Sequence, residues 1–190
     1  HQYSAGAFYN FKNIIDFSVE AYYKTMDNLI EYKDGASFLG GASELWEDKV
    51  HIGRGLSFGI ELMAQKTVGK TTGWVSYTWS RALRIFDKAD NEINSGKWFP
   101  AKYDRPHSFT VVGMHKFSDK FDISANWIIS SEQEGSLALQ RFDGGVIPPY
   151  DTNNFTTNNY SYLESRNNYR FDAYHRLDVA MNFHKQKKNG

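Results

Sequence analysis

The sequence predicts an all-β fold built from antiparallel strands. Three observations support this prediction: apolar residues recur at every second position, the connections alternate between short and long, and aromatic residues make up 16% of the 190 residues. A period of two places alternate side chains on opposite faces of a strand, whereas a helix would show a period of about 3.6. We therefore expect a sheet whose strands each have one apolar face.

The period of two defines the strands that we expect. Seven segments show it: Tyr3 to Phe11, Ile15 to Tyr23, Leu56 to Ala64, Val75 to Trp79, Phe109 to Phe117, Ile123 to Ile129 and Leu177 to Phe183. None of these segments carries an Asp, Glu, Lys or Arg on its apolar side. A strand in lipid needs such an uncharged face, since a charge near the middle of the bilayer is destabilising.

The connections between these segments alternate in length. Short connections occur at Lys12-Asn13, Val68-Gly69-Lys70 and Ser118-Asp119-Lys120, and long ones run from Asp27 to Gly53, from Asp87 to Pro106 and from Ser131 to Tyr174. Soluble domains rarely carry long structureless connections. Outer-membrane barrels combine short periplasmic turns with long outer loops and strands of about 9–11 residues. The sequence therefore favours a segment of an antiparallel transmembrane β-barrel.

An alternative is a soluble β-sandwich module that binds carbohydrate through exposed aromatic residues. Sandwich strands also alternate between apolar and polar residues, so the period alone does not separate the two folds. The sandwich predicts that Ile15, Phe17, Leu56 and Phe58 are buried in a protein core, and the barrel predicts that they face lipid. In the barrel, the even positions of 15–23 and the odd positions of 57–65 face the lumen.

The odd number of strands has a further consequence. With seven strands, the two chain ends lie on opposite sides of the membrane, and the first and last strands run in the same direction. Bacterial barrels have an even number of antiparallel strands and leave no edge facing lipid. We therefore expect an open sheet whose first and last strands do not pair, as part of a larger barrel.

Composition excludes several other classes of protein. Lys plus Arg and Asp plus Glu number 22 each, which argues against a nucleic-acid-binding face. No run of apolar residues is long enough for a membrane-spanning helix. With no cysteine and no Ser-His-Asp or paired-carboxylate pattern, we expect neither an enzyme nor a disulfide framework.

Motifs that suggest cofactors are weak. Gly69-Lys70-Thr71 resembles the end of a phosphate-binding loop, but Ala64 stands where the first glycine is required, and a turn between strands replaces the expected helix. The histidines lack metal-ligand spacing. Asp87, Asp90 and Glu92 admit calcium, yet they lack the glycine-turned loop of an EF-hand, and we interpret them as part of a solvated loop. We expect no metal and no cofactor.

The third long connection contains the most suggestive binding residues. Aromatic side chains alternate there with asparagines, and five of them are our candidate ligand contacts: Tyr150, Phe155, Tyr160, Tyr162 and Tyr169. Aromatic faces stack on sugar rings and on apolar parts of ligands, while asparagine amides both donate and accept hydrogen bonds. The other interpretation is that these side chains pack on one another without a ligand.

Five stretches resemble the C-terminal barrel half of TonB-dependent outer-membrane receptors. In chain order they are FSVEAYYKTMDNLIEY from Phe17, GRGLSFGIELMAQ from Gly53, TGWVSYTWSR from Thr72, FPAKYDRPH from Phe99 and YHRLD from Tyr174. Their order and spacing match those of the family across nearly the whole chain. Each stretch belongs to the barrel scaffold, so the resemblance concerns architecture more than ligand.

The resemblance implies a 22-stranded barrel in the bacterial outer membrane that imports a siderophore, a vitamin or a glycan. It implies an N-terminal plug domain, energy supplied through TonB, and in glycan importers a surface lipoprotein partner. Residues 1–190 would be part of the barrel domain, without the plug and the final C-terminal strands. The partners implied are outer-membrane lipid, TonB and the imported small molecule or glycan, but no nucleic acid.

These expectations predict how the chain behaves in solution. Expressed alone, it should require detergent, because its apolar stripes face lipid rather than a protein core. Analytical ultracentrifugation with and without detergent measures this. A stable monomer in water without detergent would contradict the barrel and favour the sandwich.

Overall fold

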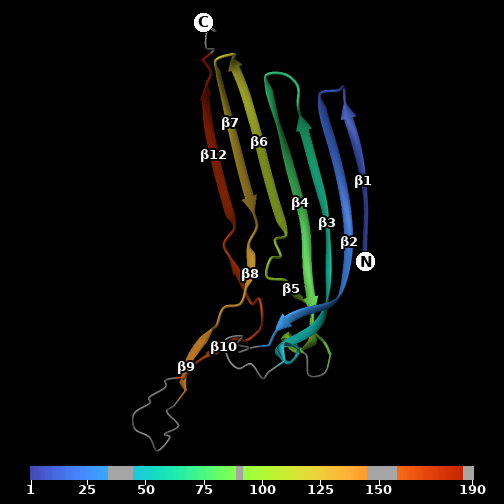
Figure 1. Ribbon diagram of the computed structural model, residues 1–190, viewed down its shortest axis with the longest axis vertical. Helices are drawn as coiled ribbons and strands as arrows, with labels where there is room; N and C mark the ends of the chain where they lie inside the picture. Colours follow the sequence, from blue (N-terminus) through green and yellow to red (C-terminus); the bar gives the residue numbers. More distant parts are fainter. Residues whose placement is uncertain (34–44, 89–91, 145–157, 186–190) are drawn as a thin grey trace, which may run out of the picture.

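The computed structural model describes residues 1–33, 45–88, 92–144 and 158–185. Its main feature is one antiparallel sheet with the strand order β1-β2-β3-β4-β6-β7-β12 (Figure 1). The bounds are β1 Gln2–Phe11, β2 Ile15–Tyr32, β3 Val50–Lys66, β4 Thr71–Ile85, β6 His107–Ser118, β7 Phe121–Ser130 and β12 Tyr174–Phe183. A short strand, β5 (Phe99–Pro100), pairs with β4 outside this order.

The seven-strand order confirms the strand map expected from the period of two. All pairs in the sheet are antiparallel. The three long connections leave the sheet at one end and the short turns close it at the other (Figure 1). In the described residues β1 and β12 occupy the two edges, point the same way and do not pair with each other, as predicted.

Several strands extend further than the sequence predicted. β2 contains 18 residues, β3 17 and β4 15, whereas β7 contains 10. The boundaries predicted for the first long connection, Asp27 to Gly53, are wrong because the β2–β3 ladder continues to the pair Tyr32 and Val50. About 9–11 tilted residues cross a bilayer, so these longer strands project past it at the long-connection end.

A bulge in β2 explains why the extension was not visible in the sequence. The register between β2 and β3 shifts between Met26 and Leu29, where Asn28 has a φ of 56°. Met26 lies opposite Gly55 and Leu29 opposite Gly53. Since an extra residue moves later side chains to the other face, Glu31, an odd-numbered residue, lies on the face that even-numbered residues occupy earlier in the strand.

The two faces of the sheet differ in polarity. Residues directly opposite on neighbouring strands share a face, which places Val19 beside Leu62, and Leu62 beside Tyr77, on the apolar face. Phe17 and Ile60 on this face are each 42% exposed, and Leu177 is 61% exposed. Of the other residues that the sandwich would bury, Ile15, Leu56 and Phe58 are partly exposed, and none of the four belongs to the buried core. These exposures do not favour the soluble sandwich.

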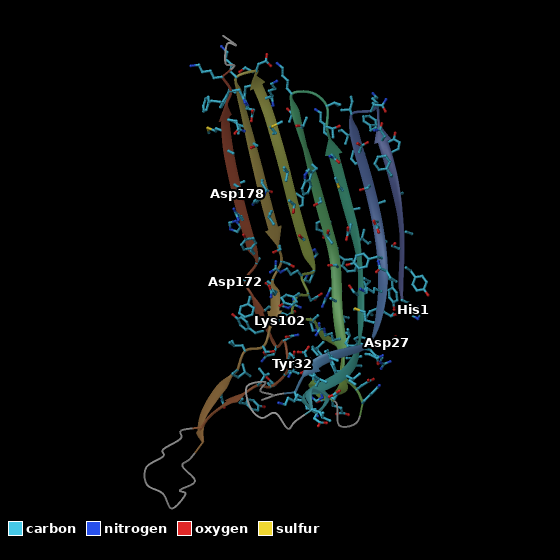
Figure 2. The ribbon with its side chains drawn as sticks, viewed as in Figure 1. His1, Asp27, Tyr32, Lys102, Asp172 and Asp178 are labelled. Atoms are coloured by element: carbon cyan, nitrogen blue, oxygen red, sulfur yellow. The ribbon has the colours of Figure 1, made fainter. Side chains whose placement is uncertain are left out.

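The opposite face is polar. Glu20 lies opposite Glu61, which in turn lies opposite Thr78, and Ser18 occupies the same face. Figure 2 shows side chains along the strands, with Asp178 midway along β12 and Tyr32 and Lys102 near the long-connection end. The even positions of β2 before the bulge and the odd positions of β3 lie on this polar face.

Aromatic residues border the apolar face at both ends. At the short-turn end the ring of Phe121 stacks on Phe117 and on Phe183, with centroids 5.5 and 4.9 Å apart. Toward the other end Phe58 meets Trp79 edge to face at 5.8 Å. Aromatic girdles of this kind lie at the two membrane interfaces of outer-membrane barrels. The apolar band between them contains mostly aliphatic residues.

The connections at the other end are partly ordered. Residues 131–174 include four short strands: β8 (Gln133–Gly135), β9 (Gln140–Gly144), β10 (Asn158–Tyr162) and β11 (Tyr169–Phe171). β8 pairs with β11, and β9 pairs with β10. Two 3₁₀ turns, η1 (Trp46–Lys49) and η2 (Asn94–Gly96), lie in the other two long connections. In the described ranges, no helix is long and apolar enough to cross a membrane.

The face assignment predicts the outcome of a pair of substitutions. Ile60→Arg should lower the free energy of unfolding in lipid by about 2–4 kcal/mol, because it places a charge on the apolar face at mid-strand. Ser18→Arg, on the polar face, should cost much less. Urea unfolding of the full-length protein in vesicles measures both.

Equal losses from the two variants would contradict the face assignment. Gly59, also on the polar face, is not a suitable control position. A Cβ added there would lie 2.7 Å from the carbonyl oxygen of Trp79, so any side chain would disturb the sheet itself.

Candidate outer-loop site

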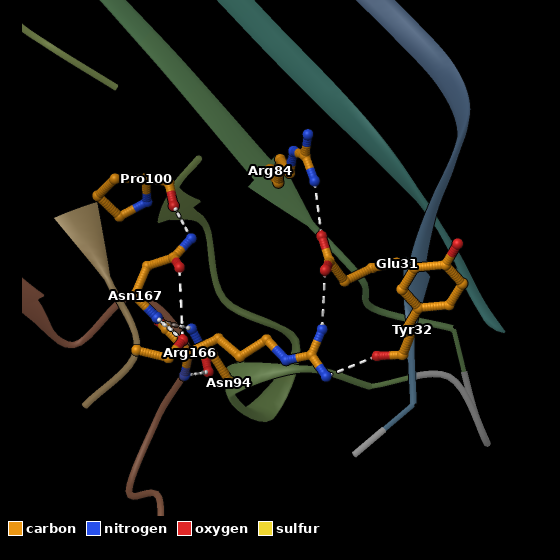
Figure 3. A network of polar contacts seen from close by, with 8 residues as sticks. Glu31, Tyr32, Arg84, Asn94, Pro100, Arg166 and Asn167 are labelled. Carbon is orange, nitrogen blue, oxygen red and sulfur yellow. Dashed lines mark hydrogen bonds and ion pairs between the residues drawn. The ribbon is translucent and has the colours of Figure 1, made fainter. Parts of the chain in front are cut away.

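The ends of β2 and β4 and the third long connection meet around one carboxylate, that of Glu31. The bulge in β2 places Glu31 on the same face as Arg84 of β4, and Arg84 Nη1 lies 2.6 Å from Glu31 Oε2. Arg166 of the third connection reaches the other oxygen, with Nη1 3.0 Å from Glu31 Oε1 (Figure 3). One carboxylate thus joins two strands of the sheet to residues 131–174.

Arg166 makes further contacts that fix its position. Its Nη2 donates to the carbonyl oxygen of Tyr32 at 2.5 Å, and its side chain is only 14% exposed. Charge-assisted bonds of this kind are stronger than neutral ones and also stronger than exposed ion pairs. We refer to Glu31, Arg84 and Arg166 together as the arginine clamp.

Asparagine side chains hold the backbone beside the clamp. Asn94 of η2 accepts from the backbone N–H of Arg166 at 2.7 Å and donates to its carbonyl oxygen at 3.0 Å. Asn167 donates to the carbonyl oxygen of Pro100 at 2.7 Å. Asn94 and Asn167 both have positive φ, which asparagine tolerates better than most residues. The second and third connections are therefore joined through these amides.

A small core lies next to the clamp. Phe86, Ile93 and Phe99 form the buried apolar cluster of the described residues, and the rings of Phe86 and Phe99 stack at 6.0 Å. Gly53 is required here, because an added Cβ would lie 2.5 Å from the Phe86 ring and 2.3 Å from the carbonyl oxygen of Ile85. This core supports the ends of β3 and β4 where they leave the lipid-facing part of the sheet.

A second polar contact fixes the end of the second connection. Asp104, 1% exposed, accepts from Ala82 N at 2.6 Å and from Arg81 Nε at 3.0 Å. Nearby, Arg105 donates to Gln133 of β8. Arg81 and Asp104 come from two of the stretches that resemble the receptor family. Their contact gives those stretches a physical role: they hold the second connection against β4.

The candidate ligand contacts fall on separate elements. Tyr162 (51% exposed) lies in β10, and Tyr169 (44% exposed) lies in β11, where its ring meets Phe171 at 5.2 Å. Tyr160 lies in β10 opposite Phe142 of β9. Tyr150 and Phe155 lie outside the described residues. Tyr162 and Tyr169 are thus exposed at the loop end, but on different strand pairs.

Sequence reasoning missed the arginine clamp. Arg84 lies 53 positions from Glu31, and Arg166 lies 134 positions from Tyr32. No local motif marks either arginine. The signal that came nearest was the asparagine-rich third connection, which includes Asn167. Among the described residues, no group of three His, Asp or Glu side chains could hold a metal ion; Asp90, considered for calcium, lies outside them.

The comparison with family models decides the family. Residues 1–188 match the family described as TonB dependent receptor-like, beta-barrel. The chain belongs to this family. Comparisons with curated proteins and with solved structures found no match.

Membership confirms the resemblance seen in the sequence and the fold class. In this chain of the TonB-dependent receptor family, the sheet is antiparallel and remains open. The family suggests import across the bacterial outer membrane rather than catalysis, and it implies an interaction with TonB. Glu31 and Arg84 lie at the ends of β2 and β4 that are opposite the short turns, where the long loops of such barrels occur.

The clamp predicts how firmly the third connection is held in this receptor. Arg166→Gln removes the ion pair to Glu31 and the bond to Tyr32, and should raise amide exchange of residues 163–171 about tenfold, equivalent to about 1.4 kcal/mol. Hydrogen-exchange mass spectrometry of the full-length receptor in detergent measures this.

Arg54→Gln is the matched control. Arg54 also forms an ion pair, 2.6 Å from Asp87, but its side chain is 52% exposed, and such surface pairs stabilise little. It should leave exchange of residues 163–171 unchanged. Similar exchange in wild type and Arg166→Gln would show that the clamp does not hold this connection.

Proposed function

We propose that this chain forms part of the barrel wall of a TonB-dependent importer in the bacterial outer membrane. The observation that carries the proposal is the two-faced sheet, with exposed apolar side chains on one face and polar side chains on the other. A surface with Phe17 and Ile60 each 42% exposed suits contact with lipid. The family match supports the same role.

The edges of the sheet support a larger barrel. β1 and β12 each have a neighbour on one side only in the described residues. Unpaired amides and carbonyls in lipid cost several kcal/mol each, so we propose that further strands pair with both edges. A plug domain would then face the polar side that carries Glu20 and Glu61, and TonB would act through an N-terminal part of the full-length receptor.

We further propose that the outer connections contact the imported molecule, whether a siderophore, a vitamin or a glycan. The exposed rings of Tyr162 and Tyr169 are the described residues that support this, together with Tyr150, Phe155 and Tyr160 from the sequence. Large exposed aromatic side chains are common at binding surfaces because they bury much area with little loss of side-chain entropy. A surface lipoprotein would be a further partner in the glycan case.

Uptake experiments test the proposed function. Cells whose growth depends on the nutrient would carry the full-length receptor, and deletion of tonB should abolish uptake. Tyr169→Ala should weaken nutrient binding several-fold, by about 1 kcal/mol or more, through loss of ring contact. Tyr9→Ala is the control, because Tyr9 is 62% exposed but lies near the short-turn end.

The tonB deletion and Tyr169→Ala test different parts of this proposal. Uptake that persists without TonB would refute the importer. Equal nutrient affinity in wild type and Tyr169→Ala, with uptake still dependent on TonB, would refute only the role of Tyr169.

A further inference from the structure

The apolar face of the sheet contains a groove of about 420 Å³ that extends over β1, β2, β3 and β4. Its lining on this face includes Ala7, Tyr9, Phe17, Val19, Ala64 and Val75. Residues directly opposite on neighbouring strands share a face, so Tyr9, Phe17, Ala64 and Val75 form one row across the four strands. Ala64 has the smallest side chain of that row and leaves space between its two neighbours.

The groove lies toward the short-turn end of the sheet (Figure 1). Tyr9 and Ala64 each stand two residues before the end of their strand, and Phe17 stands two residues after the start of β2. Since a strand rises about 3.3 Å per residue, this row is about 7 Å from the strand ends. In the proposed barrel the short turns are periplasmic, so the groove faces the periplasmic leaflet of the outer membrane.

A lysine lies on the apolar face between the groove and the turn after β3. Lys66 is two residues from Ala64 in β3, so the two side chains leave the same face of the sheet. A Cβ added at Gly69 would lie 4.0 Å from Lys66 Nζ, so the ammonium group extends to the turn. Lysines at the edge of a bilayer extend in this way and keep their charge at the interface. The ammonium group is therefore level with the lipid headgroups, next to the groove.

The charges at this end of the groove are all positive. Residues 9–15 and 64–75, which form the two turns and the adjoining strand ends, contain three lysines and no Asp or Glu. Lys12 Nζ lies 5.3 Å from the centroid of the Phe11 ring, and Lys70 ends the second turn. None of the three lysines forms an ion pair within the described residues. This part of the surface therefore attracts an anion.

The groove and the lysines together limit the kind of ligand. An apolar molecule would fill the groove but make no use of the lysines, and a small soluble anion would bind the lysines but leave the groove empty. A zwitterionic lipid would bring an ammonium group to a surface without a carboxylate. The next acid along the chain, Asp16, lies on the polar face, where it accepts a hydrogen bond from Asn10. A lipid with an anionic headgroup matches both features.

We propose that this part of the sheet binds one anionic phospholipid of the periplasmic leaflet, with an acyl chain in the groove and the phosphate at Lys66. Lys12 and Lys70 attract the headgroup from the two turns. The inference rests on the proposed function, which puts the apolar face in lipid, and it adds that this face selects one lipid class at one place. The polarity of the site agrees with that of a phospholipid, since the lysines lie at the strand ends and the groove extends from them toward mid-strand.

Native mass spectrometry of the full-length receptor in detergent tests the charged part of the site. The probes are phosphatidylglycerol and phosphatidylethanolamine with identical acyl chains, and the first should bind about tenfold more tightly. Lys66→Gln should weaken phosphatidylglycerol binding about fivefold, the effect of one lysine at an anionic lipid headgroup, and leave phosphatidylethanolamine unchanged. Lys120→Gln is the matched control, because Lys120 is an exposed lysine of the third short turn, next to Asp119 and away from the groove.

A second pair of variants tests the groove. Ala64→Phe places a ring in the groove and keeps the face apolar, so it should weaken binding of both lipids about tenfold, as expected when roughly two methylene groups lose their contact. Ala125→Phe is its control, because Ala125 lies on the apolar face opposite Gly113 and Val179 and does not line the groove.

Several outcomes would overturn the proposal. These are equal binding of the two lipids by wild type, unchanged phosphatidylglycerol binding in Lys66→Gln or in Ala64→Phe, and a receptor dimer that only Ala64→Phe dissociates, which would show that a second copy covers the groove. Loss of lipid selectivity with uptake still dependent on TonB would remove this site but keep the importer. Selective binding of phosphatidylglycerol with uptake that persists without TonB would keep the site and refute the importer.

Discussion

A backbone that crosses lipid must pair its amides and carbonyls with another part of the protein, because the bilayer offers no hydrogen-bond partners. This constraint accounts for the continuous ladder from β1 to β12, in which each strand pairs antiparallel with its neighbour. It also permits the two faces to differ, because the ladder satisfies the backbone amides and carbonyls and the side chains need not do so. The apolar face can then present hydrophobic side chains to lipid, as at Phe17 and Ile60.

The need for backbone pairing is weaker at the end of the sheet where the strands leave lipid. Beyond the bulge at Asn28, water and side chains can satisfy the backbone, and odd-numbered residues of β2 take the polar face that even-numbered residues occupy before it. This change of side places the Glu31 carboxylate where it forms ion pairs with both Arg84 and Arg166. Here the side-chain amide of Asn94 bonds to the backbone of Arg166 in another connection. Within the sheet, the neighbouring strand provides such backbone bonds instead. The loop end is therefore held by particular side chains, whereas the lipid-facing part is held by a repeating pattern.

The sequence predicted much of the sheet but little of the clamp. The seven strands, their order and their faces follow from alternation and short turns, which are local properties of the chain. The ends of β2 and β3 were missed because the bulge at Asn28 breaks the alternation that marked those strands. Tyr162 and Tyr169 could be selected as exposed aromatic residues of one connection, but their places on two separate strand pairs could not.

The sequence by itself determined that this chain forms a two-faced antiparallel sheet of seven main strands with its long connections at one end. The physical reason is that side-chain period and turn length act between neighbours in the chain, so they can be read without coordinates. Only the tertiary structure decided that Glu31 binds two arginines and that Phe86, Ile93 and Phe99 form a small core beside them. The contact between Glu31 and Arg166 joins residues 135 positions apart (166 − 31), and it depends on how the third connection meets the end of the sheet rather than on any local pattern.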